Sequence, residues 1–257
     1  MVQEFAIIGQ QRSGTTVLSD LFNRHPNFYV AKEIFHPGDA DSFQAFCALR
    51  LKEVWDGSLS QRSVLFGEFV ESLKEKSGKA IIGYNVKYAS CHHLDGDWRL
   101  LTARPGLFDF LALRGAGIIH VVRSNVFRSA LSNIRASATG VWHSNVKCDT
   151  ARPAIEIDVR RLSELITSTR LEMAAAASLI SRCSNVMTVF YEDLFSDDKF
   201  DSRQIDRLAQ FFSTDASLFN GIPQLARLSA KDWREGVLNW RDVESAVGAE
   251  FPGMLVD

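Results

Sequence analysis

The stretch from residue 9 to residue 16 combines the residue types that hold a phosphate or sulfate group. It follows a continuous apolar run, residues 5–8, and precedes a stretch with the apolar spacing of a helix, so we predict a strand-to-helix turn. Its sequence is Gly9-Gln10-Gln11-Arg12-Ser13-Gly14-Thr15-Thr16. Backbone amides at a helix N-terminus form a cradle for a tetrahedral anion, and Arg12 adds a positive charge.

One position in this loop decides which anion it suits. The common phosphate loop, G-x-x-x-x-G-K-[ST], has a lysine that reaches the β- and γ-phosphates of a nucleoside triphosphate. Here Thr15 takes the place of that lysine, whereas both glycines and the final hydroxyl, that of Thr16, are present. The loop is therefore predicted to hold one tetrahedral group and to be poorly equipped for ATP. The alternative is a glycine-rich turn without a ligand.

A second group of basic residues follows the apolar run 118–122. Arg123 comes directly after this run, and the helix predicted next places Arg128, Ser132 and Arg135 on one face. Ligands of open α/β sheets bind at the carboxyl ends of the strands, so Arg123 is expected on the ligand side. The alternative for the helix is a solvated basic face. Together with the strand-end arginine, the pattern favours a second anion site.

Five apolar runs alternate with helical patterns and are predicted to carry these groups. The predicted strands are 5–8, 28–31, 80–86, 118–122 and 186–191. The first predicted helix follows the loop 9–16 and ends at Pro26. The other predicted helices are most of 43–76, then 107–113, about 126–138 and 162–183. This alternation indicates an α/β fold with a P-loop-type, mostly parallel β-sheet flanked by helices on both faces. The length and the lack of a linker predict a single domain over 1–257, mostly helical in its C-terminal third.

The composition excludes several classes of protein. An apolar fraction of 46% and a charged fraction of 23% are typical of a packed globular chain and exclude a disordered or coiled-coil protein. The net charge of −2 argues against a general nucleic-acid binder. No apolar stretch is long enough for a transmembrane span or a signal peptide, so a cytoplasmic location is expected. The four cysteines lack metal-ligand spacing and are predicted to be reduced thiols.

Taken together, these segments resemble the sulfotransferases that use 3′-phosphoadenosine 5′-phosphosulfate (PAPS). Residues 11–16 resemble that family's 5′-phosphosulfate loop, and residues 121–132 resemble its 3′-phosphate motif. The resemblance implies that Arg123 and Ser132 bind the 3′-phosphate, that Arg12, Ser13, Gly14, Thr15 and Thr16 bind the phosphosulfate, and that no metal takes part. The spacing of Arg123 and Ser132 is one residue longer than in the cytosolic animal enzymes. It matches the bacterial branch that includes trehalose and nodulation-factor sulfotransferases.

Further stretches and the catalytic residues come from the same resemblance. Residues 139–142 and 189–194, and more weakly 239–240, are similar to stretches of these relatives. Glu33, just after the strand 28–31, matches the proposed general base of the trehalose-type and heparan-type relatives, with His36 as the runner-up. Lys87, at the end of the strand 80–86, resembles a lysine that stabilises the transferring sulfuryl group. The alternatives are a solvated loop glutamate and a surface lysine.

Three other histidines are assigned no chemistry. His120 lies inside an apolar strand and is interpreted as a core histidine with a satisfied hydrogen bond. His92 and His93 are adjacent in sequence, so their side chains point in different directions on any regular element.

The sequence thus predicts a sulfotransferase whose acceptor is a hydroxyl of a carbohydrate, glycolipid or small metabolite. The rival hypothesis is a P-loop kinase or NTPase, for which Glu192-Asp193 after the strand 186–191 would form the metal-binding Walker B motif. A third is a non-catalytic anion-binding module. Specificity is expected in the loops 32–58, 89–105 and 140–157. Neither the acceptor nor the oligomeric state is set by the sequence.

Overall fold

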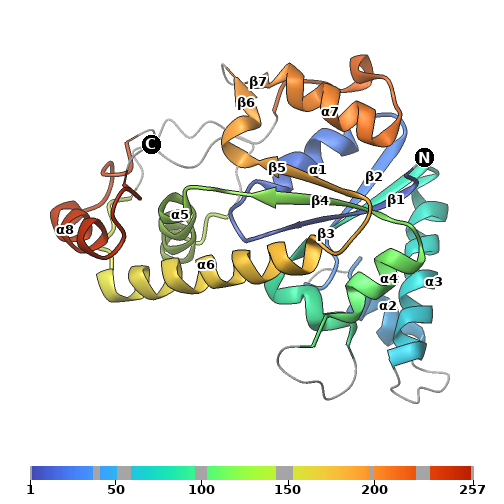
Figure 1. The fold of residues 1–257 in the computed structure, drawn as a ribbon, viewed down its shortest axis with the longest axis horizontal. Helices are drawn as coiled ribbons and strands as arrows, with labels where there is room; N and C mark the ends of the chain where they lie inside the picture. Colours follow the sequence, from blue (N-terminus) through green and yellow to red (C-terminus); the bar gives the residue numbers. More distant parts are fainter. Residues whose placement is uncertain are drawn as a thin grey trace.

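A computed structural model describes residues 2–36, 41–50, 59–95, 103–142, 153–196, 199–223 and 232–255. Its centre is a five-stranded parallel sheet in the order β2-β3-β1-β4-β5 (Figure 1). The strands are β1 (Glu4–Gly9), β2 (Phe28–Glu33), β3 (Ile81–Lys87), β4 (Gly117–Val122) and β5 (Val186–Phe190). The mostly parallel α/β fold predicted from the sequence is confirmed.

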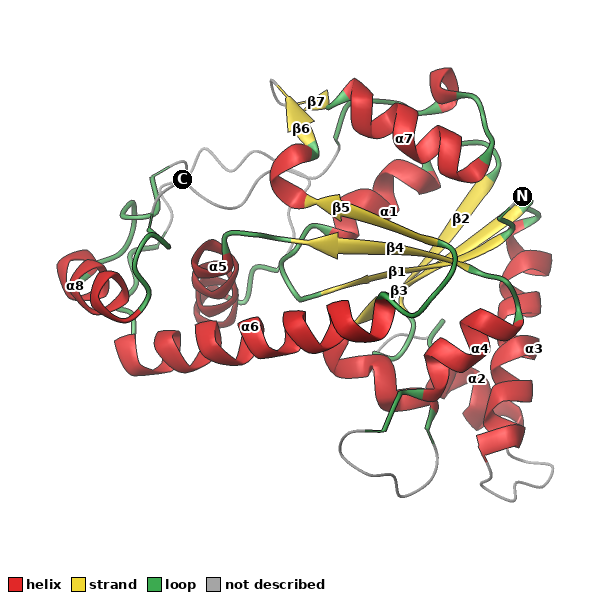
Figure 2. Ribbon diagram, viewed as in Figure 1, coloured by secondary structure: helices red, strands yellow, loops and turns green. Residues whose placement is uncertain are grey.

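Helices cover both faces of this sheet (Figure 2). On one face, α1 (Thr15–Asn23) and α7 (Ser202–Phe212) pack their apolar sides against the strands. On the other face lie α3 (Leu59–Ser77), α4 (Gly106–Leu113) and the C-terminal part of α6 (Val159–Ile180). The side chains of the central strand β1 point alternately to the two faces. Phe5 and Ile7 belong to the apolar cluster with α1 and α7, and Ala6 and Ile8 belong to the apolar cluster with α3, α4 and α6.

A third apolar cluster lies beyond the carboxyl ends of the strands. It joins α5 (Val126–Thr139), the N-terminal part of α6 and α8 (Trp240–Glu250) around the buried ring of Trp233. Figure 1 shows α5 directly past the tips of β4 and β5. The cluster holds α5 against the edge of the sheet at which a ligand of an open α/β fold binds.

The remaining elements are short. They are α2 (Phe43–Arg50), the 3₁₀ turns η2 (Tyr88–Leu94), η3 (Tyr191–Asp193) and η4 (Ala216–Leu218), and the hairpin β6 (Phe195–Ser196) and β7 (Lys199–Phe200). In the part of the chain that the structure describes, no helix is both long and apolar enough to cross a bilayer.

Several element boundaries differ from the sequence predictions. β2 continues past Ala31 to Glu33 through a bulge, so Glu33 closes a strand and does not start a loop. α6 begins at Val159, where Asp158 accepts a hydrogen bond from the backbone N–H of Arg161 as an N-cap, and it ends at Ile180. The predicted break near residues 56–57 and most of the loop 140–157 lie outside the described residues.

Candidate functional site

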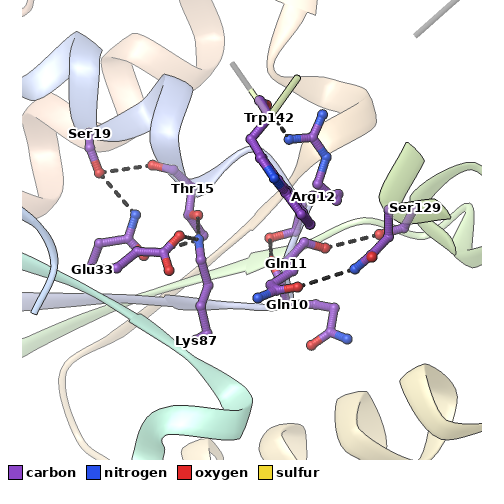
Figure 3. Close-up of polar contacts among 12 residues, drawn as sticks. Gln10, Gln11, Arg12, Thr15, Ser19, Glu33, Lys87, Ser129 and Trp142 are labelled. Atoms are coloured by element: carbon purple, nitrogen blue, oxygen red, sulfur yellow. Dashed lines mark hydrogen bonds and ion pairs between the residues drawn. The ribbon is translucent and has the colours of Figure 1, made fainter. Parts of the chain in front are cut away.

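The carboxyl ends of the three central strands bring the predicted site residues together. In the sheet, Gly9 at the end of β1 is paired with Lys87 of β3 on one side and with Val121 of β4 on the other. The loop 9–16 therefore begins between the strand that ends at Lys87 and the strand that Arg123 follows. Figure 3 shows Arg12, Thr15, Lys87 and Glu33 in this region.

Two glycines allow the loop its path. A Cβ on Gly9 would lie 2.7 Å from both the Ser13 hydroxyl and the carbonyl oxygen of Val121. Gly14 has a φ of +93° and is the N-cap of α1, and a Cβ there would lie 2.5 Å from the ring of Tyr191. A side chain at either position would push the loop away from its neighbours.

The hydroxyl groups of the loop have different partners. Ser13, which is fully buried, donates its Oγ hydrogen bond to the carbonyl oxygen of Gln10 at 2.7 Å and closes the turn. Thr15 is also buried, and its Oγ1 accepts a hydrogen bond from Lys87. Thr16 is half-buried in the first turn of α1. Ser13 therefore holds the turn together, and Thr15 ties the loop to β3.

Arg12 links the loop to the second predicted anion site. Its Nε donates to the Oγ of Ser132 at 3.0 Å, and its Nη1 donates to the carbonyl oxygen of Trp142 at 2.6 Å. Its φ of +64° is unusual for a residue with a side chain. Burial lowers the pKa of this guanidinium. The two motifs that the sequence places 120 residues apart are thus in direct contact.

Arg123, which directly follows β4, also contacts the loop 9–16. Its Nη1 donates to the carbonyl oxygen of Arg12 at 3.0 Å, and its guanidinium lies over the ring of Tyr191, 4.6 Å from the ring centroid. Arg123 and Ser132 expose only 7% and 8% of their surface. Two arginines and a serine therefore form a compact, cation-rich site next to the loop.

The basic face of α5 is not solvated, so the alternative of an exposed face is wrong. Arg128 is buried. Arg135 donates to the carbonyl oxygens of Trp233, at 2.9 Å, and Glu235. These contacts arise because α5 packs against α6 and the segment that contains Trp233. Arg135 thus anchors the C-terminal segment, and Ser132 faces the loop.

Lys87 and Glu33 form the other half of the site. The Lys87 ammonium contacts Thr15 Oγ1, lies 3.4 Å from Asn85 Oδ1 and is paired with Glu33 Oε1 at 3.4 Å. The lysine side chain is 7% exposed and the glutamate side chain 35%. Burial lowers the pKa of Lys87, and the carboxylate of Glu33 opposes that change. Lys87 is therefore a buried group and not a surface lysine, and Glu33 is paired and not solitary.

His36 lies close to Glu33 in the chain but differs from it in position. Its backbone N–H donates to the carbonyl oxygen of Glu33 at 2.8 Å in the turn after β2, and the residue is exposed. Glu33 is paired with Lys87, another residue of the predicted site.

Two residues at this site, Asn85 and Tyr191, were not predicted from the sequence. Asn85, nearly fully buried on β3, contacts Lys87 and also donates to the hydroxyl of Ser19 at 3.3 Å. Tyr191, after β5, lies against both Gly14 and Arg123. A polar residue two positions before Lys87 on a buried strand was the available signal for Asn85. The resemblance of residues 189–194 to a family stretch was the signal for Tyr191.

Glu192 does not occupy a Walker B position. β5 is an edge strand separated from β1 by β4, and the Glu192 carboxylate accepts hydrogen bonds from the backbone N–H groups of Ser124 and Asn125. Among the described residues no group of three or more His, Cys, Asp and Glu side chains is arranged to hold a metal ion.

His120 and His92 have local partners, and the described cysteines form no disulfide. His120 is buried and its Nε2 lies 2.7 Å from the hydroxyl of Tyr88, and burial lowers the His120 pKa to about 4, so its interpretation as a core histidine is confirmed. His92 contacts Asp95 at 3.0 Å in η2. The described cysteines, Cys47, Cys91 and Cys183, are free thiols.

Comparison with known proteins identifies the family of this chain. The model of the sulfotransferase family matches residues 4–215, so the chain belongs to the sulfotransferase family. No curated protein matches the chain significantly.

Two solved sulfotransferases resemble it over almost its whole length. One is from Alicyclobacillus acidocaldarius, with 12% identity, a TM-score of 0.47 and coverage of 99% of this chain and 96% of the other. The other is mouse sulfotransferase SULT7A1 complexed with PAP, with 13% identity, a TM-score of 0.45 and coverage of 98% and 84%.

Proposed function

We propose that this sulfotransferase moves the sulfuryl group from PAPS to a hydroxyl of a carbohydrate, glycolipid or small metabolite. The observation that carries the proposal is the convergence of Arg12, Lys87 and Arg123 on one helix N-terminus, from the ends of three adjacent strands. Such an arrangement supplies positive charge to two separate anionic groups without the lysine of a nucleoside-triphosphate loop. It fits a donor with a 5′-phosphosulfate and a 3′-phosphate.

The proposed reaction is an in-line displacement at sulfur. The acceptor oxygen forms a bond to sulfur while the bond from sulfur to the 5′-phosphate oxygen breaks, and 3′,5′-adenosine bisphosphate leaves with the electron pair. Glu33 takes the proton of the attacking hydroxyl. Lys87, Arg12 and the loop amides of residues 14–16 stabilise the charge that develops on the leaving phosphate. Arg123 and Ser132 bind the 3′-phosphate.

The acceptor class follows from the resemblance to the trehalose-type and nodulation-factor-type enzymes. Those relatives match this chain in the spacing of Arg123 and Ser132, and the position of Glu33 matches the trehalose-type and heparan-type enzymes. We further propose that residues 1–257 act as one domain, because the three apolar clusters lie on the two faces and at the carboxyl edge of one sheet.

Binding of 3′,5′-adenosine bisphosphate should be much tighter than binding of AMP. The two nucleotides differ by the 3′-phosphate, and each charge-assisted hydrogen bond to it is worth about 1.5–3 kcal/mol. Arg123→Ala is expected to remove most of this preference. Calorimetric titration of both nucleotides into the wild type and the variant measures it. Arg203→Ala, which changes an exposed arginine of α7, serves as the matched control, and equal affinity of the wild type for both nucleotides would refute the assignment.

Turnover with PAPS should not depend on a divalent metal. A kinase uses Mg²⁺ to bridge β- and γ-oxygens, whereas the charges on the proposed donor are met by Arg12, Lys87 and Arg123. The measurement is turnover before and after treatment with EDTA. Activity that disappears with EDTA and returns with Mg²⁺ would support the kinase hypothesis, which the position of Glu192 already disfavours.

A further inference from the structure

Tyr191 and Glu192, directly after the edge strand β5, contact both anion-binding motifs. The ring of Tyr191 fills the space beside Gly14 of the loop and lies under the guanidinium of Arg123. The carboxylate of Glu192 accepts hydrogen bonds from the backbone N–H groups of the two residues that follow Arg123. The reaction proposed above gives Glu192 no part in the chemistry, so its contacts require a separate explanation.

The carboxylate of Glu192 is held by two backbone donors. Its Oε2 accepts from the N–H of Ser124 at 3.1 Å, and its Oε1 accepts from the N–H of Asn125 at 3.0 Å. These two residues connect Arg123 to the first turn of α5, of which Asn125 is the N-cap. A carboxylate near a helix N-terminus is favourable because of the helix dipole. The interaction therefore fixes the backbone from which the Arg123 side chain extends.

These contacts also determine which groups can meet a phosphate. Free amides at a helix N-terminus are common phosphate donors. At the start of α5 the amides of Ser124 and Asn125 are instead used by Glu192, and that of Arg128 is used by the Asn125 side chain. The recognition of an anion here therefore depends on side chains, chiefly Arg123 and Ser132, and on their direction.

We propose that Glu192 is a positioning residue that aims Arg123 at the 3′-phosphate of the donor. The inference rests on the proposed function. Arg123 is restrained by the ring of Tyr191, by the carbonyl oxygen of Arg12 and, through its own backbone, by Glu192. Loss of the Glu192 contact leaves the 5′-phosphosulfate loop in place and lets Arg123 move away from the 3′-phosphate.

The test is the ratio of the affinities for 3′,5′-adenosine bisphosphate and AMP, measured by calorimetry on the full chain. Glu192→Gln keeps the shape of the side chain but loses the charge and one of the two acceptors, so the ratio should fall about 10-fold, the value of one charge-assisted hydrogen bond. Glu192→Asp keeps the charge but is too short to reach both amides, and it should also lower the ratio. The matched control is Asp193→Asn, which neutralises the adjacent exposed carboxylate and should leave the ratio unchanged.

Melting temperatures distinguish positioning from a loss of fold, because a merely structural role would lower stability without changing the ratio. A wild-type ratio in Glu192→Gln or in Glu192→Asp would overturn the inference, and so would an equal loss in Asp193→Asn. A wild type that does not prefer the bisphosphate would overturn the proposed function, and this inference with it.

Discussion

Replacement of Glu33 by glutamine should lower turnover roughly 10²–10⁴-fold, the usual contribution of a general base. Glu33→Gln keeps the size and the hydrogen bonding of the side chain but removes its basicity. Glu33 is the last residue of β2, at the carboxyl ends of the strands, where the loop 9–16 also lies. Its Oε1 is 3.4 Å from the Lys87 ammonium. Because the proposed role of Glu33 is toward the acceptor hydroxyl and not toward the nucleotide, the affinity for 3′,5′-adenosine bisphosphate should stay nearly unchanged.

The measurement combines turnover with PAPS and calorimetry with the bisphosphate. Glu75→Gln, on the exposed side of α3, is the control for loss of a negative charge. Turnover within a few-fold of the wild type would show that Glu33 is not the base, and His36→Gln would then be the next variant. A collapse of bisphosphate affinity would show instead that Glu33 holds the loop through Lys87.

Removal of the Lys87 charge should lower turnover by about 10²–10³-fold, as does the loss of one preorganised donor to a developing charge. Lys87→Met has a similar length and fills the same buried space. Burial lowers the pKa of Lys87, which means that burying its charged form is unfavourable for folding. The uncharged methionine side chain does not have this cost. Glu33 is 35% exposed and can be solvated without its partner. The melting temperature is therefore expected to stay the same or to rise.

Both expectations, the lower turnover and the unchanged or higher melting temperature, are tested by measuring turnover and thermal unfolding of Lys87→Met. Lys74→Met, at an exposed position in α3, is the matched control. An activity near that of the wild type would make Lys87 a structural residue only. A large drop in melting temperature would mean that the ammonium holds Thr15 and the loop in place, and the loss of turnover would then have a different cause.

The class of fold could be predicted from periodicity alone, whereas the order of the strands could not. An apolar run such as residues 5–8 indicates a buried strand, but it does not encode which other runs pair with it. β1 lies between β3 and β4, and only this order brings Lys87 and Arg123 to either side of the loop. The end of β2 was also missed, because a bulge carries the strand past Lys32 to Glu33.

The candidate site was predictable where residues occur in a motif and not where tertiary contacts define them. Residues 9–16, Arg123 and Ser132 belong to two local patterns. The pairing of Lys87 with Glu33, and the burial of Arg128, depend on how β2 packs beside β3 and how α5 packs against α6. A basic face on a predicted helix is expected to contact either solvent or a ligand. The sequence does not show that another segment of the chain packs over this face of α5.

The contact of the loop with Tyr191 has a consequence for how the protein matures during synthesis. Arg12 leaves the ribosome about 180 residues before Tyr191, which corresponds to roughly 10–35 s at ordinary elongation rates of about 5–20 residues per second. Throughout that time the loop lacks the ring that packs on Gly14 and supports Arg123. We therefore expect a nascent chain to have no competent donor site until β5 has been made. The donor can then stabilise the finished protein but cannot guide the earlier steps of its folding.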